Sequence, residues 1–359
     1  MNRLTRSFHR PTPATAPTTR PMPTQSAWEG RTALLASVGL SKRDHNAVLG
    51  AAAHKFIEGM PLDLQERRLL SDHCCKKNTA VLALMQDLRP DFVPVLSVMP
   101  PDDTPFDERA QRTIESLKAA VELELAFEVH LGDVPVTGAV MDALENAMTA
   151  PGARITAFHF ESPWAEDQDG RFVHQALLQR LSDSLKGCAS LQEVRGGMGV
   201  LWLLDRPVEH LSIVSAQPPR SADMAQLKRV LGHGVGRFTC ASDDVRVFPA
   251  VTGVVRAANT QASAETAVQA VTLHHPYRAP RGPEGAKAVD DLLHTPHLKR
   301  LMLPASEWLN ALGDHTLTER IGDTGLQALD FGDGLGGLSL PVMNALAANA
   351  ATPANPPRV

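Results

Sequence analysis

Three apolar residues in the segment 298–303, Leu298, Leu301 and Leu303, follow the spacing L-x-x-L-x-L. The same spacing recurs over the second two thirds of the chain, with first positions 17 to 36 residues apart. Self-similarity at such intervals is typical of stacked repeat proteins, and each copy is long enough for one short strand. The copies are Ala120, Leu123 and Leu125; Ile155, Phe158 and Phe160; Leu191, Val194 and Gly196; Val208, Leu211 and Ile213; Val235, Phe238 and Cys240; Val268, Val271 and Leu273; Leu298, Leu301 and Leu303; and Leu326, Leu329 and Phe331.

The segments between these copies carry apolar residues at helical spacing. The expected helices run through Val140 to Met148, Val173 to Leu185, Met224 to Leu231 and Val289 to Leu293, and a last one starts at Pro341. Gly, Pro and Asp separate the pieces, as at Gly322-Asp323-Thr324-Gly325. A strand followed by a helical crossover, repeated along the chain, predicts an α/β horseshoe whose parallel strands line the concave face.

The pattern resembles leucine-rich repeats of the long, helix-bearing kind found in ribonuclease-inhibitor-like proteins, over residues 117–348. The family pattern continues to an Asn that satisfies backbone groups in the turn after the strand. The corresponding positions here are Glu128, Pro163, Ala216, Asp243, Pro276, Ser306 and Gly334. The repeat is therefore degenerate and its turns must close in another way. The 17 residues from Leu191 to Val208 also leave no room for a full helix.

In such a horseshoe the third and fifth positions of each copy point out of the concave face. They form two ladders, with Glu122, Glu124 and Glu193 toward the first copies and Arg237 and Arg300 toward the last. A graded ladder of this kind favours a charged protein partner over a small ligand. The predicted protein-binding residues are Glu122, Glu124, His159, Glu193, Arg195, His210, Arg237, Thr239, Thr272, Arg300, Met302 and Asp330.

An α/β enzyme with an unrecognised site, including a doubly wound nucleotide-binding fold, is an alternative because strands also alternate with helices there. No glycine-rich phosphate loop opens a helix after a strand, and Gly196-Gly-Met-Gly199 is followed by an apolar run. No nucleophile elbow or paired metal-ligand motif is present. Cys240 occupies an apolar position of its copy and should be buried and inert. We therefore expect no catalytic residues, no metal and no cofactor.

Composition narrows the possible partners. The net charge is −5 and aromatic residues make up 4% of the chain, which argues against a nucleic-acid-binding stripe. No run of 18 apolar residues exists, so no integral membrane segment is expected. The four cysteines, an adjacent pair and two singles, form neither a disulfide framework nor a zinc motif.

Residues 1–26 contain no Asp or Glu and are rich in Arg, Thr and Pro. The segment lacks the apolar core of a secretory signal peptide and is predicted to be disordered. It resembles the unfolded secretion signal of type III effectors of pathogenic bacteria. An organelle transit peptide and a plain tail are the alternatives, although five prolines oppose a targeting helix.

Residues 27–116 read as an α-helical head or cap, with helices through Val48 to Phe56, Leu64 to Leu70 and Val81 to Met85, and another from Asp107 to Leu117. Met60-Pro-Leu-Asp-Leu64 resembles the start of an F-box, the helical module that binds the Skp-type adaptor of ubiquitin ligases. Residues 349–359 are expected to be a disordered tail.

Together these patterns predict a non-enzymatic, type III effector-like leucine-rich-repeat protein. It would be secreted into a host cell and would bind a host protein on its concave face. An F-box-like substrate adaptor and an α/β enzyme remain the alternative functions.

Overall fold

The computed structural model describes residues 45–77, 80–97, 106–131, 137–150, 154–160, 175–215, 217–275, 283–303, 314–331 and 340–351. Its strands form one sheet of nine, every neighbouring pair is parallel, and the order follows the sequence. This sequential order excludes a doubly wound sheet. The strands are β1 (Val95–Ser97), β2 (Ala126–Leu131), β3 (Arg154–Phe160), β4 (Glu193–Gly196), β5 (Val208–Val214), β6 (Val235–Ala241), β7 (Ala270–His274), β8 (Arg300–Leu303) and β9 (Ala328–Phe331).

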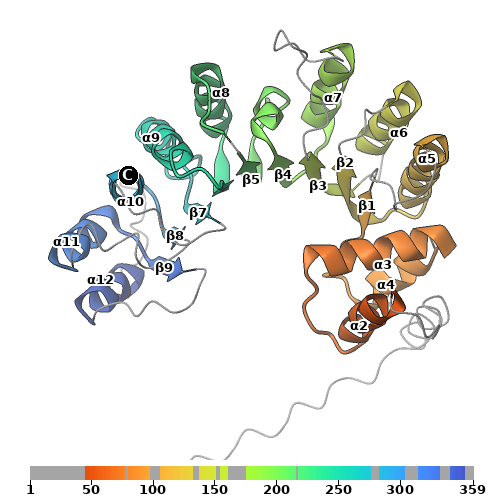
Figure 1. Cartoon of the computed structure of the whole chain (residues 1–359), viewed down its shortest axis with the longest axis horizontal. Helices are drawn as coiled ribbons and strands as arrows, with labels where there is room; N and C mark the ends of the chain where they lie inside the picture. Colours follow the sequence, from red (N-terminus) through yellow and green to blue (C-terminus); the bar gives the residue numbers. More distant parts are fainter. Residues whose placement is uncertain are drawn as a thin grey trace, which may run out of the picture.

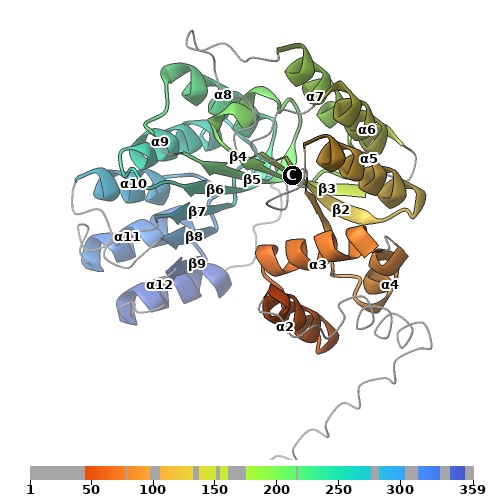
Figure 2. The same ribbon diagram turned by 45° about the vertical axis from the view of Figure 1, so that its right-hand side comes forward.

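The helices lie side by side on the outer side of the curved sheet, and the strands line its inner, concave side (Figures 1 and 2). This is the α/β arrangement with parallel strands and crossover helices that the sequence predicted. The helices along the sheet are α5 (Phe106–Glu122), α6 (Gly138–Thr149), α7 (Gln175–Gly187), α8 (Ser221–Gly232), α9 (Val247–Asn259), α10 (Pro283–Leu293), α11 (Asp314–Thr324) and α12 (Leu340–Ala351).

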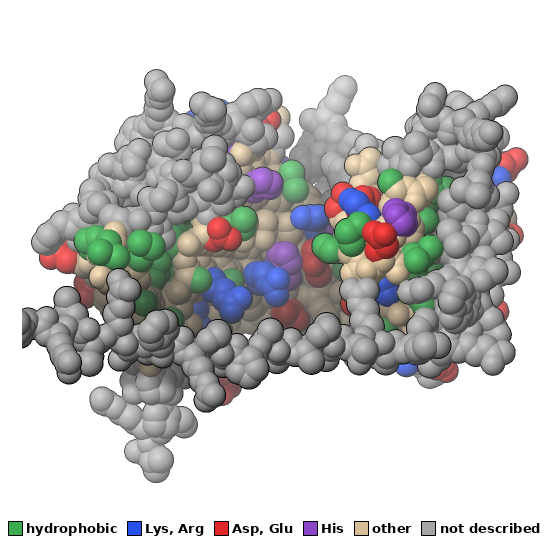
Figure 3. Space-filling view, turned by 90° about the horizontal axis from the view of Figure 1, so that it is seen from below, with side chains coloured by type: hydrophobic (Ala, Val, Ile, Leu, Met, Phe, Trp, Pro, Cys, Tyr) green, Lys and Arg blue, Asp and Glu red, His purple; other side chains and the backbone are tan. Residues whose placement is uncertain are grey.

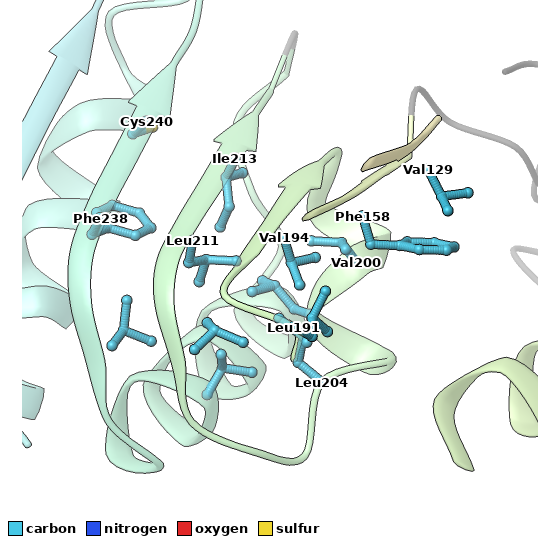
Figure 4. Close-up of a cluster of buried hydrophobic side chains, with 14 of the residues drawn as sticks. Val129, Phe158, Leu191, Val194, Val200, Leu204, Leu211, Ile213, Phe238 and Cys240 are labelled. Carbon is cyan, nitrogen blue, oxygen red and sulfur yellow. The ribbon is translucent and has the colours of Figure 1, made fainter. Parts of the chain in front are cut away.

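Apolar side chains of equivalent repeat positions line up across the sheet and point toward the helices. Val194 aligns with Leu211, which aligns with Phe238, and all three are fully buried (Figure 4). Toward the end of the sheet, Leu301 and Leu303 are also buried, whereas Met302 between them is only half-buried. The predicted alternation is therefore confirmed for these strands.

The first predicted copy, Ala120, Leu123 and Leu125, is wrong. Helix α5 continues to Glu122, and Glu124 lies in a turn with a φ of 52°. Buried Leu117 and Ala120 extend the helical spacing into the predicted strand, which explains the error. The true strand is β2, and β1, which pairs with it, was not predicted.

The short interval between β4 and β5 is real. Both strands exist, and a single 3-10 helix, η1 (Met198–Trp202), replaces the crossover helix there. Val200 and Leu201 of η1 are buried, so this short connection still covers the sheet with apolar side chains. Helices α9 and α11 were not predicted from their apolar spacing.

Serine closes two of the turns in which the repeat pattern lacks its Asn. Ser242, directly after β6, donates from Oγ to the carbonyl oxygen of Ser215, directly after β5, over 2.6 Å. Its Oγ also accepts from the Asp244 N–H at 3.0 Å. The backbone groups of these turns are thus satisfied by a short hydroxyl side chain one position before the expected Asn.

Three helices precede the sheet: α2 (His45–Ile57), α3 (Leu64–Lys77) and α4 (Ala80–Leu88). Helix α3 lies beside β1 (Figure 1), and Ser71 Oγ accepts from the Val95 N–H at 2.8 Å.

The predicted tail 1–26 lies outside the described residues. The predicted tail at 349–359 is helical in its first three residues, because α12 ends at Ala351. Within the described part of the chain, no helix has the length and apolar character needed to cross a membrane.

Candidate functional site

Ten of the twelve predicted binding residues lie on strands at the third or fifth repeat position. The concave face is hollowed, and basic, acidic and histidine side chains gather in the hollow (Figure 3). The ten predicted residues that lie on strands are His159, Glu193, Arg195, His210, Arg237, Thr239, Thr272, Arg300, Met302 and Asp330.

Glu122 and Glu124 do not belong to this face, because they lie at the end of α5 and in the turn that follows, and both are exposed. Glu128 and His130 take their places, since they align with Ala157 and His159 of β3. The signal in the sequence was the alternation of apolar and polar residues in Ala126–Leu131, typical of a half-buried strand.

Glu128 is held by an arginine that comes from outside the sheet. Arg67 of α3 donates from Nη1 to Glu128 Oε1 and from Nη2 to Oε2 at 3.3 Å. The same Nη1 donates to the carbonyl oxygen of Val93 at 3.2 Å. Burial raises the pKa of Glu128, and the arginine opposes that shift. Helix α3 thereby fixes a charged pair at the first repeats.

His130 and His159 stack on each other beside this pair. Their ring centroids are 3.9 Å apart with an interplanar angle of 19°, and each residue is 3% exposed. Neither Nε2 atom has a hydrogen-bond partner, although both are buried. His159 Nε2 lies 3.7 Å from Glu128 Oε2, beyond hydrogen-bond distance.

Both imidazoles are neutral at pH 7. Burial lowers the pKa of His130 to about 2, and the neighbouring His159 and arginines add to the shift. Burial also lowers the pKa of His159 to about 4, although Glu193 opposes the change. Glu128, His130 and His159 together bring three possible metal-ligand atoms within 4.8 Å of one another. No metal site was predicted from the sequence, and this group was missed because its three residues come from two different strands.

A second polar network crosses the next three strands. His210 Nδ1 lies 3.3 Å from Glu193 Oε2, and His210 Nε2 lies 2.9 Å from Thr239 Oγ1. Burial alone would raise the pKa of Glu193, but the hydrogen bond and charge of His210 lower it overall. Arg195 donates from Nε to Ser212 Oγ at 3.3 Å, so its guanidinium is also oriented.

The carboxylate, imidazole and hydroxyl of this network are connected in the manner of a nucleophile and its base. An acyl-transfer site also needs free donors for the oxyanion, and backbone N–H groups inside a parallel sheet are engaged with neighbouring strands. The network therefore orients His210 at the wall of a pocket of about 230 Å³, which is lined by Val93, Glu128, Thr156, Ala157, Gln192, Glu193, Glu209, His210 and Arg237.

The concave face is open over the last repeats. Arg237, Ala270 and Arg300 occupy aligned positions on three successive strands. The ion pair of Arg237 with Glu209 spans 3.3 Å, and the two side chains are 54% and 61% exposed. Arg300, Ala328 and Asp330 are exposed as well, and Thr272 and Met302 are half-buried.

Cys240 is fully buried, as predicted, and its burial raises the pKa of its thiol to about 12, which disfavours the reactive thiolate. No protein-family model matches the chain, and no curated protein matches it either.

Proposed function

We propose that the chain is a repeat protein that binds an acidic protein surface on the concave face of its last four strands, β6 to β9. The observation that carries this proposal is the pair Arg237 and Arg300. The two residues stand two strands apart with only Ala270 between them, so their backbones are separated by about 10 Å.

The surroundings of this pair suit a protein surface. Ala270 on β7 and Ala328 on β9 occupy the third repeat position on either side of Arg300, so only small side chains flank it there. Thr272 and Met302 offer polar and apolar contact beside it. The backbone N–H of Arg300 donates to the carbonyl oxygen of Gln269 at 3.0 Å, but its guanidinium has no hydrogen-bond or ion-pair partner among the described residues. A guanidinium left free in this way can bind a carboxylate through two hydrogen bonds.

The finer assignments belong to the same proposal. The repeats are degenerate leucine-rich repeats of the ribonuclease-inhibitor-like kind, and helices α2, α3 and α4 act as their N-terminal cap. The cap assignment is supported by α3, which packs beside the first strand and pairs with Glu128. The F-box-like alternative rests on the five residues from Met60 to Leu64 and is tested by binding to a purified Skp-type adaptor.

Delivery as a type III effector is supported by the acid-free composition of residues 1–26. If it is correct, this segment fused to a reporter should be exported by bacteria with a working type III system and retained by a secretion-deficient strain. Retention in both strains would remove the effector part of the proposal and leave the binding surface as a separate hypothesis.

The binding proposal is tested by reversing charge on two surfaces. Arg237→Glu with Arg300→Glu alters the concave face, and Lys118→Glu with Lys228→Glu makes the same change in net charge on exposed positions of α5 and α8. Proteins captured from a host-cell extract by the immobilised wild type should be lost with the concave variant and kept with the control. Capture of the same proteins by both variants would contradict the proposal.

A further inference from the structure

We propose that Glu128, His130 and His159 form a binding site for a divalent transition-metal ion, with Zn²⁺ as the best match. The site is independent of the proposed protein-binding surface, which lies on β6 to β9. Two imidazoles and one carboxylate are a ligand set that zinc takes up in proteins.

The first argument is the cost of leaving the cluster empty. A buried polar atom without a partner costs on the order of 1–3 kcal/mol, and such atoms are rare in native proteins. Here two of them, the Nε2 atoms of His130 and His159, belong to residues that are aligned on adjacent strands. One ion between them would satisfy both.

The second argument is geometry. Metal bonds of ~2.0–2.2 Å in a tetrahedral site place ligand atoms roughly 3.3–3.5 Å apart. His159 Nε2 and Glu128 Oε2 are already 3.7 Å apart, and all three candidate ligand atoms lie within 4.8 Å of one another. The rings are stacked and nearly parallel, so both must turn out of the stack, by rotation about the soft χ2 torsion of histidine, before their in-plane lone pairs can share one ion.

The third argument is the support of the ligands. Arg67 donates to both oxygens of Glu128, at 3.3 Å for Oε2, and thereby orients the carboxylate, as partners outside the ligand shell commonly do. Arg68 of α3 and Glu193 and Arg195 of β4 also act electrostatically on the two imidazoles, so with Arg67 and Glu128 the cluster has three basic and two acidic groups around it.

Three protein ligands leave one position of a tetrahedral ion open. Glu128 is also part of the wall of the 230 Å³ pocket, whereas neither histidine is, so the cluster borders this pocket through Glu128. A water molecule or a small anionic group of a ligand could occupy the open position.

The test uses the full-length chain without a histidine tag, freed of metal with a chelator and titrated with ZnCl₂ by calorimetry. His130→Phe and His159→Phe keep a buried ring in the stack while they remove the ligand atom, so both variants should fold. We expect one zinc ion per wild-type chain and a loss of affinity of at least roughly 100-fold in each variant. Glu128→Gln should weaken binding by at least about tenfold.

The matched control is His233→Phe, since His233 is exposed next to α8 and far from the cluster in the sequence. It should bind zinc as the wild type does. X-ray absorption of the zinc-loaded wild type should show two imidazoles and oxygen ligands without sulfur, a result that does not depend on any variant folding. Absence of binding at micromolar zinc, binding that survives in both phenylalanine variants, or sulfur in the ligand shell would each overturn the proposal.

Discussion

The two ends of the concave face are built from the same repeat positions but differ in what covers them. At the first repeats the fifth position holds His130 and His159, both buried, and the third holds Glu128, which is paired with an arginine of α3. At the last repeats the fifth position holds half-buried Met302, and the third holds exposed Arg300.

The difference shows that a repeat position does not determine the environment of its side chain. Arg67 of α3 pairs with Glu128 at the first repeats, whereas none of the described helices covers the concave face of β6 to β9 (Figure 1). Polar residues of one face are therefore fixed and buried at one end, and available to a partner at the other.

The largest effect expected from a single substitution is in the shared apolar core. Leu301 is 1% exposed and aligns with Val271 and Leu329 on either side. Leu301→Ala should lower the free energy of unfolding by ~2–5 kcal/mol, the range for a buried leucine. Met302→Ala should cost roughly a tenth to a half as much. Urea denaturation measures both, and equal losses would contradict the assigned faces of β8.

Two arginines allow the ends to be compared directly. Arg67→Met removes the partner of a carboxylate whose side chain is 11% exposed and should lower the free energy of unfolding by ~1–3 kcal/mol. Arg237→Met removes the partner of Glu209, whose side chain is 61% exposed. This substitution should change the free energy of unfolding by only ~0–1 kcal/mol. If the two variants lose the same stability in denaturation experiments, the concave face at the first repeats is no more shielded from solvent than at the last.

The buried histidines predict a pH dependence that the open end should lack. Their folded-state pKa values lie below the ordinary 6.5, so below pH 6.5 the unfolded chain binds protons that the folded chain does not. Stability should therefore fall as the pH is lowered from 6.5 toward 4, by up to about 1.4 kcal/mol per histidine for each pH unit.

The measurement compares wild type with the chain carrying both His130→Phe and His159→Phe, in the presence of a chelator. Glu128 shifts stability in the opposite sense because its folded-state pKa is raised, and it is present in both proteins. The variant should lose less stability than the wild type over this range. Parallel curves would mean that the imidazoles titrate normally in the folded chain.

The smallest effect is expected from the N-terminal segment. A chain that begins at Ala27 should melt within error of the full-length protein, because a segment that is not packed contributes almost no burial. A decrease of several degrees in the melting temperature would show that residues 1–26 stabilise the fold.

The sequence predicted the sheet well wherever one strand supplies its own signal. The spacing of Val208, Leu211 and Ile213 and its equivalents identified strands whose burial depends on local alternation alone. It failed at Ala120, Leu123 and Leu125, where the end of a helix has the same apolar spacing as a strand.

The candidate metal cluster could not be found by spacing within one segment. His130 and His159 are 29 residues apart and meet only because β2 and β3 pair in that register. Arg67, which fixes Glu128, is 61 residues from its partner. Contacts between elements that are distant in sequence follow from the sheet register and from the position of α3, and neither is contained in a local pattern.

Site-specific photo-crosslinking can show whether a protein partner binds the open end of the concave face. A photoreactive amino acid is placed in turn at Thr272 on β7, at exposed Glu122 at the end of α5, and at exposed Lys228 on α8. Each protein is irradiated in a host-cell extract, and the crosslinked products are identified by mass spectrometry. Thr272 should yield a discrete crosslinked protein, and its yield should decrease when Arg237 and Arg300 are changed to Glu. The other two sites should yield none. The same product from Glu122 or Lys228, with none from Thr272, would show that the partner does not bind at the open end of the concave face.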